Sequence, residues 1–248
     1  MIFKEEVMIT PFHCMRTLHI YVPDEALHSE KRYPVLYMYD GHNLFDDEEA
    51  TYGKSWGMRK WLDENQAKLI VVGLECNHEG TERLSEFSPY DFNFQKQRIH
   101  GKGKILMRWM VEELKPLIDQ ELPTLPQRET TAIGGSSMGG LMALYSVLHH
   151  NETFSKAAAL SPHIFGMVKP LQAEMNRFID PDTQIYISWG SKECRSKRQL
   201  AMVTNCACTF ANEKPWSVYL NCKVDGEHNE ASWEAELPVF MRYLFKEG

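Results

Sequence analysis

Apolar residues gather in short runs along the whole chain, and most of these runs have the length and residue types of buried strands. Eight such runs recur: EVMIT, RTLHIYVP, PVLYMYD, LIVVGLE, TTAIGG, AAALSP, QIYISWG and WSVYLNCKV. Segments with helical periodicity separate most of the later runs or follow them, namely GKILMRWMVEELKPLIDQEL, GLMALYSVLHH and LPVFMRYLFK. Strands without intervening helices, followed by alternating strands and helices, predict an α/β fold. We expect a three-layer sandwich with a mostly parallel central sheet and antiparallel N-terminal strands.

Length and composition indicate that the chain folds as a single globular unit. It has 248 residues, of which 43% are hydrophobic, and it shows no internal repeat, low-complexity tract or linker. We therefore expect one domain spanning residues 1–248. The N-terminal stretch MIFKEEVMITPFH is acidic where a signal peptide is basic, and no apolar run approaches about 18 residues. These features predict a cytoplasmic protein.

Charge and cysteine content exclude several function classes. The net charge is −7, and no cluster of Lys and Arg is present, which argues against a nucleic-acid partner or an anionic membrane partner. The six cysteines are scattered, so we expect free thiols. Cys206 and Cys208 lack a second pair at zinc-site spacing. We expect neither a metal nor another cofactor.

The stretch TTAIGGSSMGGLMALYSVLHH crowds four glycines around two serines. A Gly-x-Ser-x-Gly string alone is weak evidence, but here it fills the turn between a buried strand and a helix. That context is typical of a nucleophile elbow, in which glycines two residues either side of the serine prevent steric collisions. Ser137 is the candidate nucleophile. A phosphate-binding loop is the alternative, but the stretch lacks the Lys-Ser/Thr ending of that motif.

A serine nucleophile requires a base, and four histidines follow Ser137 in the sequence. His149 and His150 lie on the helix directly after the elbow, too close in sequence to fold back over it. His163 follows an apolar strand and could line the site. His228 lies in a polar glycine turn after the last strand, where α/β-hydrolases carry the base. We therefore assign His228 as the candidate base.

The acid of the triad is less sharply indicated. Glu193 lies in ISWGSKE, a short loop past the end of the preceding strand, and Asp225 is its rival. A Ser-His pair without a strong acid is a third alternative. We favour Glu193.

Ester cleavage also requires N–H donors for the oxyanion that forms on attack. One donor is expected from the backbone of Met138, the residue after the nucleophile, and the other from the loop DGHNLFDD after the third strand. Gly41 would let this loop turn tightly, so that the N–H of His42 or a neighbour points into the site. The alternative is that Asp40 and Gly41 form a simple turn.

Several motifs together resemble the putative-esterase group of α/β-hydrolases, which includes siderophore esterases, feruloyl and acetylxylan esterases and esterase D. The motifs are YMYDGHNLFDD, ERLSEFSPYDF, GGSSMGGLMALY, WGSKE and GEHNEASWEAELPVFMRYL, and they span nearly the whole chain. The resemblance implies Ser137 as nucleophile, Glu193 as acid and His228 as base. It also implies that the N–H groups of His42 and Met138 form the oxyanion hole.

The resemblance further places Asp40 and the loop from Arg83 to Asp91 at the substrate mouth. Of the six tryptophans, which are mostly packing residues in a core of this size, only Trp56 is expected near the site. We therefore count Asp40, Gly41, Arg83 and Trp56 as candidate substrate-binding residues.

These observations predict a serine esterase that hydrolyses small carboxylic esters through a Ser-His-Glu triad and an acyl-enzyme. The alcohol part would be a sugar, a phenol or a siderophore-like group, and the sequence does not choose among them. An acyltransferase with the same triad and an inert binding protein on the same fold remain alternatives. The expected partner is a small-molecule ester, and the oligomeric state is left open.

Overall fold

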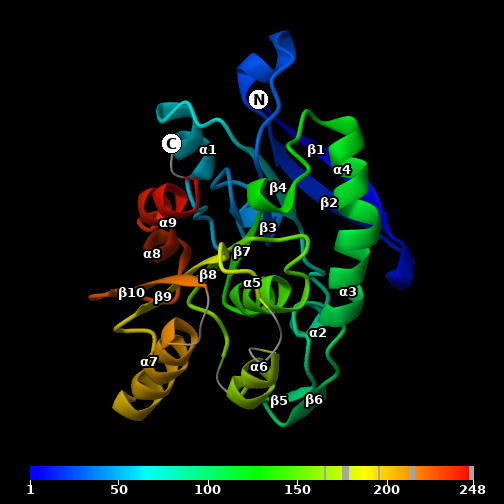
Figure 1. Cartoon of the computed structure of the whole chain (residues 1–248). Helices are drawn as coiled ribbons and strands as arrows, with labels where there is room; N and C mark the ends of the chain where they lie inside the picture. The colour runs from blue at the N-terminus through cyan, green and yellow to red at the C-terminus, as the bar shows by residue number, and fades with distance from the viewer. Residues whose placement is uncertain (165, 175–178, 195, 213–215, 246–248) are drawn as a thin grey trace.

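The chain folds around one eight-stranded sheet, which confirms the predicted α/β architecture (Figure 1). The computed structural model describes residues 1–248 except 165, 175–178, 195, 213–215 and 246–248. The strands lie in the order β1-β2-β4-β3-β7-β8-β9-β10. Their bounds are β1 Ile2–Ile9, β2 Cys14–Tyr21, β3 Val35–Tyr39, β4 Ile70–Leu74, β7 Thr131–Ser136, β8 Lys156–Leu160, β9 Gln184–Gly190 and β10 Ser217–Lys223.

Strand direction follows the prediction from the spacing of strands and helices. β1 pairs antiparallel with β2, and β2 pairs antiparallel with β4, whereas every pair from β4 to β10 is parallel. Consecutive antiparallel strands need only a short connection, and parallel strands need a crossover. The early run of strands without helices therefore became the antiparallel edge.

Helices connect the parallel strands. Their bounds are α1 Met58–Glu64, α2 Glu82–Glu86, α3 Gly103–Trp109, α4 Lys115–Glu121, α5 Met138–His149, α6 Val168–Glu174, α7 Lys197–Asn212, α8 Glu230–Glu234 and α9 Leu237–Leu244. The long helix expected at residues 103–122 is present, with a π-helical turn at Met110–Leu114 that joins α3 to α4. Several elements were not predicted: helices α1, α2, α6 and α7, and a hairpin of β5 (Phe92–Phe94) and β6 (Gln97–Ile99), whose strands are too short to show periodicity.

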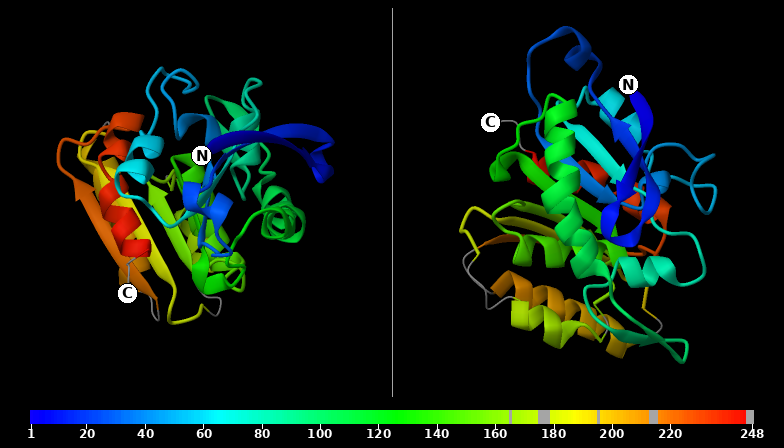
Figure 2. Two further views of the ribbon diagram at one scale, coloured as in Figure 1. Left: turned by 90° about the horizontal axis from the view of Figure 1, so that it is seen from above. Right: turned by 90° about the vertical axis from the view of Figure 1, so that its right-hand side faces the viewer.

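Helices cover both faces of the sheet and so make the three layers (Figure 2). An apolar cluster lies on each face. In β3, Val35, Tyr37 and Tyr39 face the cluster that includes residues of α3 to α7. Leu36 and Met38 face the cluster with α1, α8 and α9. This alternation is the period of two that a strand imposes on its side chains. Among the described residues, no helix has both the length and the apolar character needed to cross a bilayer.

The parallel strands all end at the same edge of the sheet, and the strand order reverses between β3 and β7. The chain goes from β3 to β4 on one side and later returns to β7 on the other. In open α/β sheets, ligands bind beyond the carboxyl ends of the strands at such a reversal. The 3-10 turn Gly41–Asn43, called η3, follows β3 there, and α5 follows β7.

Candidate active site

Ser137 occupies the sharp turn between β7 and α5. Its backbone has φ 55° and ψ −116°, a conformation that is strained for a residue with a side chain. The Ser137 N–H donates to the Leu160 carbonyl at 3.0 Å, which holds the turn against β8. A Cβ on Gly135 would lie 2.9 Å from the carbonyl carbon of Gly139, and one on Gly139 would lie 2.8 Å from Cβ of Tyr39. Gly135 is therefore required by a close contact within the turn, and Gly139 by a close contact with β3.

A cavity of about 480 Å³ opens beside this turn. Five of the sequence-predicted residues line it: Asp40, His42, Arg83, Ser137 and His228. They come from four separate stretches of the chain that the sheet brings to one edge. The candidate nucleophile and the candidate base thus face the same space.

Glu193 holds the ring of His228. Its Oε2 lies 3.2 Å from Nδ1 of His228, while its Oε1 accepts hydrogen bonds from the Gly190 N–H at 2.6 Å and the Ser161 hydroxyl at 2.5 Å. The Ser161 hydroxyl in turn accepts from Nε1 of Trp233 at 2.9 Å. A chain of hydrogen bonds therefore runs from Trp233 through Ser161 and Glu193 to His228.

Asp225, the rival acid, points elsewhere. Its carboxylate pairs with the Lys192 ammonium at 3.0 Å, and its side chain is 71% exposed. Glu193 is the carboxylate that the fold places against His228.

The loop of His228 is fixed at both ends. Asn229, the next residue, caps α8 by accepting from the Ser232 N–H at 3.0 Å. On the other side, a Cβ on Gly190 would collide with the carbonyl oxygen of Gly226, so the acid loop and the histidine loop touch through their backbones. The ring of His228 also packs edge-on against Trp233, with ring centres 5.2 Å apart.

His163, the other histidine considered from the sequence, contributes its backbone. Its N–H donates to the Ser137 carbonyl at 2.8 Å. Burial lowers the pKa of the His163 ring, and the charges of His228 and Arg83 lower it further. The ring is therefore neutral near pH 7 and adds no charge to the site.

The turn after β3 is built differently from what the sequence suggested. Asp40, and not Gly41, adopts the left-handed conformation, with φ 58°. Gly41 is required because a Cβ there would collide with the carbonyl oxygen of Gly73 in β4. The prediction that a glycine is needed was right, but its physical reason is close approach between two backbones. As a result the first N–H groups of η3 lie at the same end of the sheet as the start of α5.

Asp40 and Arg83 form a partly buried, bidentate ion pair in the cavity wall. Nε and Nη2 of Arg83 donate to the two carboxylate oxygens of Asp40 at 2.7 and 2.6 Å. Burial alone would raise the pKa of Asp40, but the adjacent guanidinium outweighs burial and lowers that pKa below its ordinary value. Arg83, which lies in α2, thereby braces the turn that carries His42.

A comparison with protein families decides the classification. A family model described as "Putative esterase" matches residues 10–244. The chain belongs to this esterase family. It is a carboxylic ester hydrolase with the α/β-hydrolase fold.

Individual relatives of this esterase are distant. Uncharacterized protein YbbA of Bacillus subtilis (strain 168) is 21% identical over 188 residues, which cover 75% of this chain and 72% of YbbA. Ferri-bacillibactin esterase BesA of the same organism is 25% identical over 163 residues, which cover 60% of this chain and 54% of BesA. The chain therefore matches only about half the length of BesA.

Solved structures show the same fold. The IroE-like serine hydrolase from Shewanella oneidensis has a TM-score of 0.80 at 19% identity, over 99% of this chain and 80% of that one. The enterochelin esterase from Shigella flexneri has a TM-score of 0.73 at 17% identity, over 99% of this chain and 58% of that one.

In this esterase Trp56 lies behind the site. Its side chain is 2% exposed and packs against Trp233, with ring centres 5.7 Å apart. Of these two tryptophans, Trp233 lines the cavity. A direct contact between Trp56 and substrate stays a prediction from the sequence.

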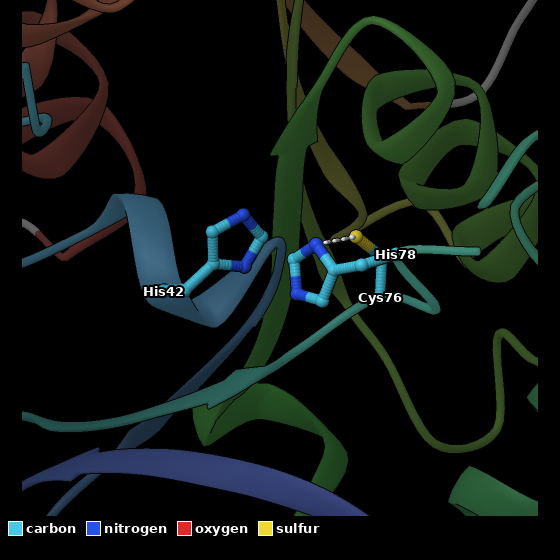
Figure 3. A group of neighbouring side chains, drawn as sticks. All are labelled: His42, Cys76 and His78. Atoms are coloured by element: carbon cyan, nitrogen blue, oxygen red, sulfur yellow. Dashed lines mark hydrogen bonds between the residues drawn. The ribbon is translucent and has the colours of Figure 1, made fainter. Parts of the chain in front are cut away.

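Several residues of the esterase site were not singled out from the sequence. Ser161 follows β8 directly, so the rule that sites gather at the carboxyl ends of parallel strands could have indicated it. Glu230 lines the cavity; burial raises its pKa, and the charge of Asp40 raises it further. His42, Cys76 and His78 form a compact group whose potential ligand atoms all lie within 4.8 Å of one another (Figure 3). No sequence motif signals this group, because two segments far apart in the chain supply it.

Proposed function

We propose that this esterase cleaves its substrates as a serine hydrolase, with Ser137 as nucleophile, His228 as base and Glu193 as acid. One observation carries the proposal: Ser137 and His228 line a single cavity, and Glu193 lies 3.2 Å behind Nδ1 of His228. We also propose that residues 1–248 form one domain, because the eight-stranded sheet contains both the first strand, β1, and the last strand, β10.

The first step is attack of the Ser137 hydroxyl on the ester carbonyl. Glu193 accepts a hydrogen bond from Nδ1–H of His228, which leaves the lone pair on Nε2 free to take the Ser137 proton. The same imidazolium then gives that proton to the departing alcohol. Because Oε1 of Glu193 is already occupied by two donors, only Oε2 is directed at the histidine.

The tetrahedral oxyanion would be bound by the backbone N–H groups of Met138 and His42. Met138 is the first residue of α5, and the first N–H groups of a helix have no partner within it. His42 lies in η3, directly after β3, and β3 pairs with β7, the strand that ends just before Ser137. Water attacks the resulting acyl-enzyme with His228 again acting as base.

The cavity wall supports a polar alcohol part in the ester. Arg83 and Asp40 line it together with Ser137 and present an anchored guanidinium to the substrate. BesA is named as a ferri-bacillibactin esterase, and the Shigella structure as an enterochelin esterase. We propose a small acyl ester of a phenolic, siderophore-like or sugar alcohol as the substrate class.

The test is hydrolysis of a p-nitrophenyl ester series, from acetate to octanoate, by the wild type and by Ser137→Ala. We expect kcat/KM of Ser137→Ala to fall by at least about 10⁴-fold, because the nucleophile is removed. Labelling by a fluorophosphonate should be lost in the same variant. Sugar acetates, feruloyl esters and catecholate trilactones are then compared on the wild type.

Ser136→Ala is the matched control, because Ser136 is the adjacent residue and has the same side chain. We expect it to retain labelling by the fluorophosphonate. Labelling that survives in Ser137→Ala and is lost in Ser136→Ala would refute the assignment of the nucleophile.

A further inference from the structure

His42, Cys76 and His78 bring three metal-ligating side chains to one wall of the cavity (Figure 3). His42 comes from η3, while Cys76 and His78 follow the end of β4. The rings of His42 and His78 meet edge to face, with centres 4.7 Å apart, and Nδ1 of His78 lies 3.9 Å from the Cys76 sulfur. Two imidazoles and one thiol are a donor set that suits zinc and related transition metals.

The side chain of His42 is prepared for a ligand. Its Nε2 lies 2.9 Å from the Thr51 hydroxyl, whereas its Nδ1 is buried and has no hydrogen-bond partner among the described residues. The residue as a whole is 6% exposed. A buried polar atom without a partner is costly and requires an explanation. A proton on Nε2, donated to Thr51, leaves the Nδ1 lone pair available, and such an outer partner is typical of histidines that bind metals.

A carboxylate beside the group favours a cation: the Glu75 carboxylate lies 3.9 Å from Nε2 of His78. The charges of Asp40 and Arg83, which also lie nearby, offset each other in their bidentate pair.

We propose that His42, Cys76 and His78 bind one divalent zinc-class ion, with the fourth coordination position open to the cavity. A tetrahedral site requires ligand atoms about 3.4–3.6 Å apart, given Zn–N near 2.1 Å and Zn–S near 2.3 Å. The present separations are within 4.8 Å. His78 is 56% exposed, so rotation of its side chain can close the difference. Binding releases the Cys76 thiol proton to solvent and leaves the thiolate as ligand.

The site goes beyond the proposed hydrolysis. It uses the side chain of His42, whereas the oxyanion hole would use the backbone N–H of the same residue. An ion here joins η3 to the segment after β4 and occupies part of the cavity that Ser137 lines. Entry of the ester into the cavity would therefore depend on the concentration of the ion.

The experiment is a titration of chelator-treated protein with Co²⁺, which substitutes for Zn²⁺ and reports thiolate ligation through a charge-transfer band. We expect one equivalent of Co²⁺ to give this band in the wild type, and one equivalent of Zn²⁺ to remove it. Cys76→Ser should abolish the band. Thr51→Val should weaken Co²⁺ affinity by about tenfold, as loss of an outer-shell partner typically does.

Cys208→Ser is the matched control, because Cys208 is exposed and remote in sequence from the group. It should leave the band unchanged. His78→Ala tests the site at an exposed position where folding is safe, and it should lower Co²⁺ affinity by at least about tenfold. A wild type without the band at excess Co²⁺, or a band that survives both Cys76→Ser and His78→Ala, would overturn the proposal. None of these readings depends on esterase activity.

Discussion

The two halves of the site are held by different forces. The half after β3 and β7 is packed: Asp40, Ser136 and Met138 are at most 5% exposed, and an ion pair braces it. The half after β9 and β10 is open: the His228 side chain is 43% exposed, and hydrogen bonds through Glu193 hold it. We conclude that substitutions of the supporting residues in the packed half, apart from the nucleophile and the oxyanion hole, should cost stability, whereas those in the open half should cost rate.

Glycine contacts in the site differ in sequence distance. Gly135 and Gly139 touch each other within the single turn at Ser137. By contrast, Gly41 touches Gly73 in β4, and Gly190 touches Gly226 in a loop after a different strand. A local contact leaves a motif in the sequence, while a contact between distant loops does not.

The largest effect in the open half is expected from Glu193→Gln. The amide would present N–H or oxygen to Nδ1 of His228 without the negative charge, and it would no longer fix the tautomer that leaves Nε2 free. We expect kcat for p-nitrophenyl acetate to fall by about 10³-fold. The free energy of unfolding, measured with urea, should change much less than the rate.

Asp225→Asn is the matched control, since Asp225 is the rival acid and pairs only with Lys192 at the surface. We expect kcat within about twofold of the wild type, as for most exposed substitutions. The comparison of the halves fails if kcat falls in Asp225→Asn and stays at the wild-type value in Glu193→Gln.

The packed half is tested by Asp40→Asn. Asn tolerates the left-handed backbone at this position, so the change removes the charge and keeps the turn. It leaves the Arg83 charge unpaired. Breaking a fully buried pair costs about 3–5 kcal/mol, and because Arg83 is 30% exposed we expect about 2 kcal/mol near pH 7.

The pH dependence of this loss has a definite sign. The folded-state pKa of Asp40 is lowered from 3.8, so the pair stabilises the fold above that pH and loses its contribution as pH falls through the folded-state pKa. The difference in urea stability between wild type and Asp40→Asn should therefore shrink from pH 7 to pH 3. An equal difference at both values would contradict an ionised Asp40 in the folded protein.

The sequence predicted what local patterns encode. The eight strands of the sheet and the elbow at Ser137 follow from apolar runs and from glycines close to the serine. Ser161 was missed although its place directly after β8 could have indicated it, whereas the grouping of Cys76 and His78 with His42 arises only when strands align their ends in the fold. The sequence could not choose between the two candidate acids for a similar reason. Glu193 and Asp225 both lie in loops near the last strands, and only the fold directs one of them to His228.

The smallest effect concerns Ser161, which positions Glu193 without being predicted to touch substrate. Ser161→Ala removes a donor to the Glu193 carboxylate and the acceptor for Trp233. A hydrogen bond to a charged group is worth about 1.5–3 kcal/mol, so we expect kcat to fall by about tenfold with KM little changed. Ser161 has φ 46°, which glycine adopts without strain, so Ser161→Gly removes the hydroxyl and the backbone strain together. Equal losses of kcat in both variants would assign the effect to the hydroxyl; full activity in Ser161→Gly would show that the hydrogen-bond chain through Ser161 does not set the position of the acid.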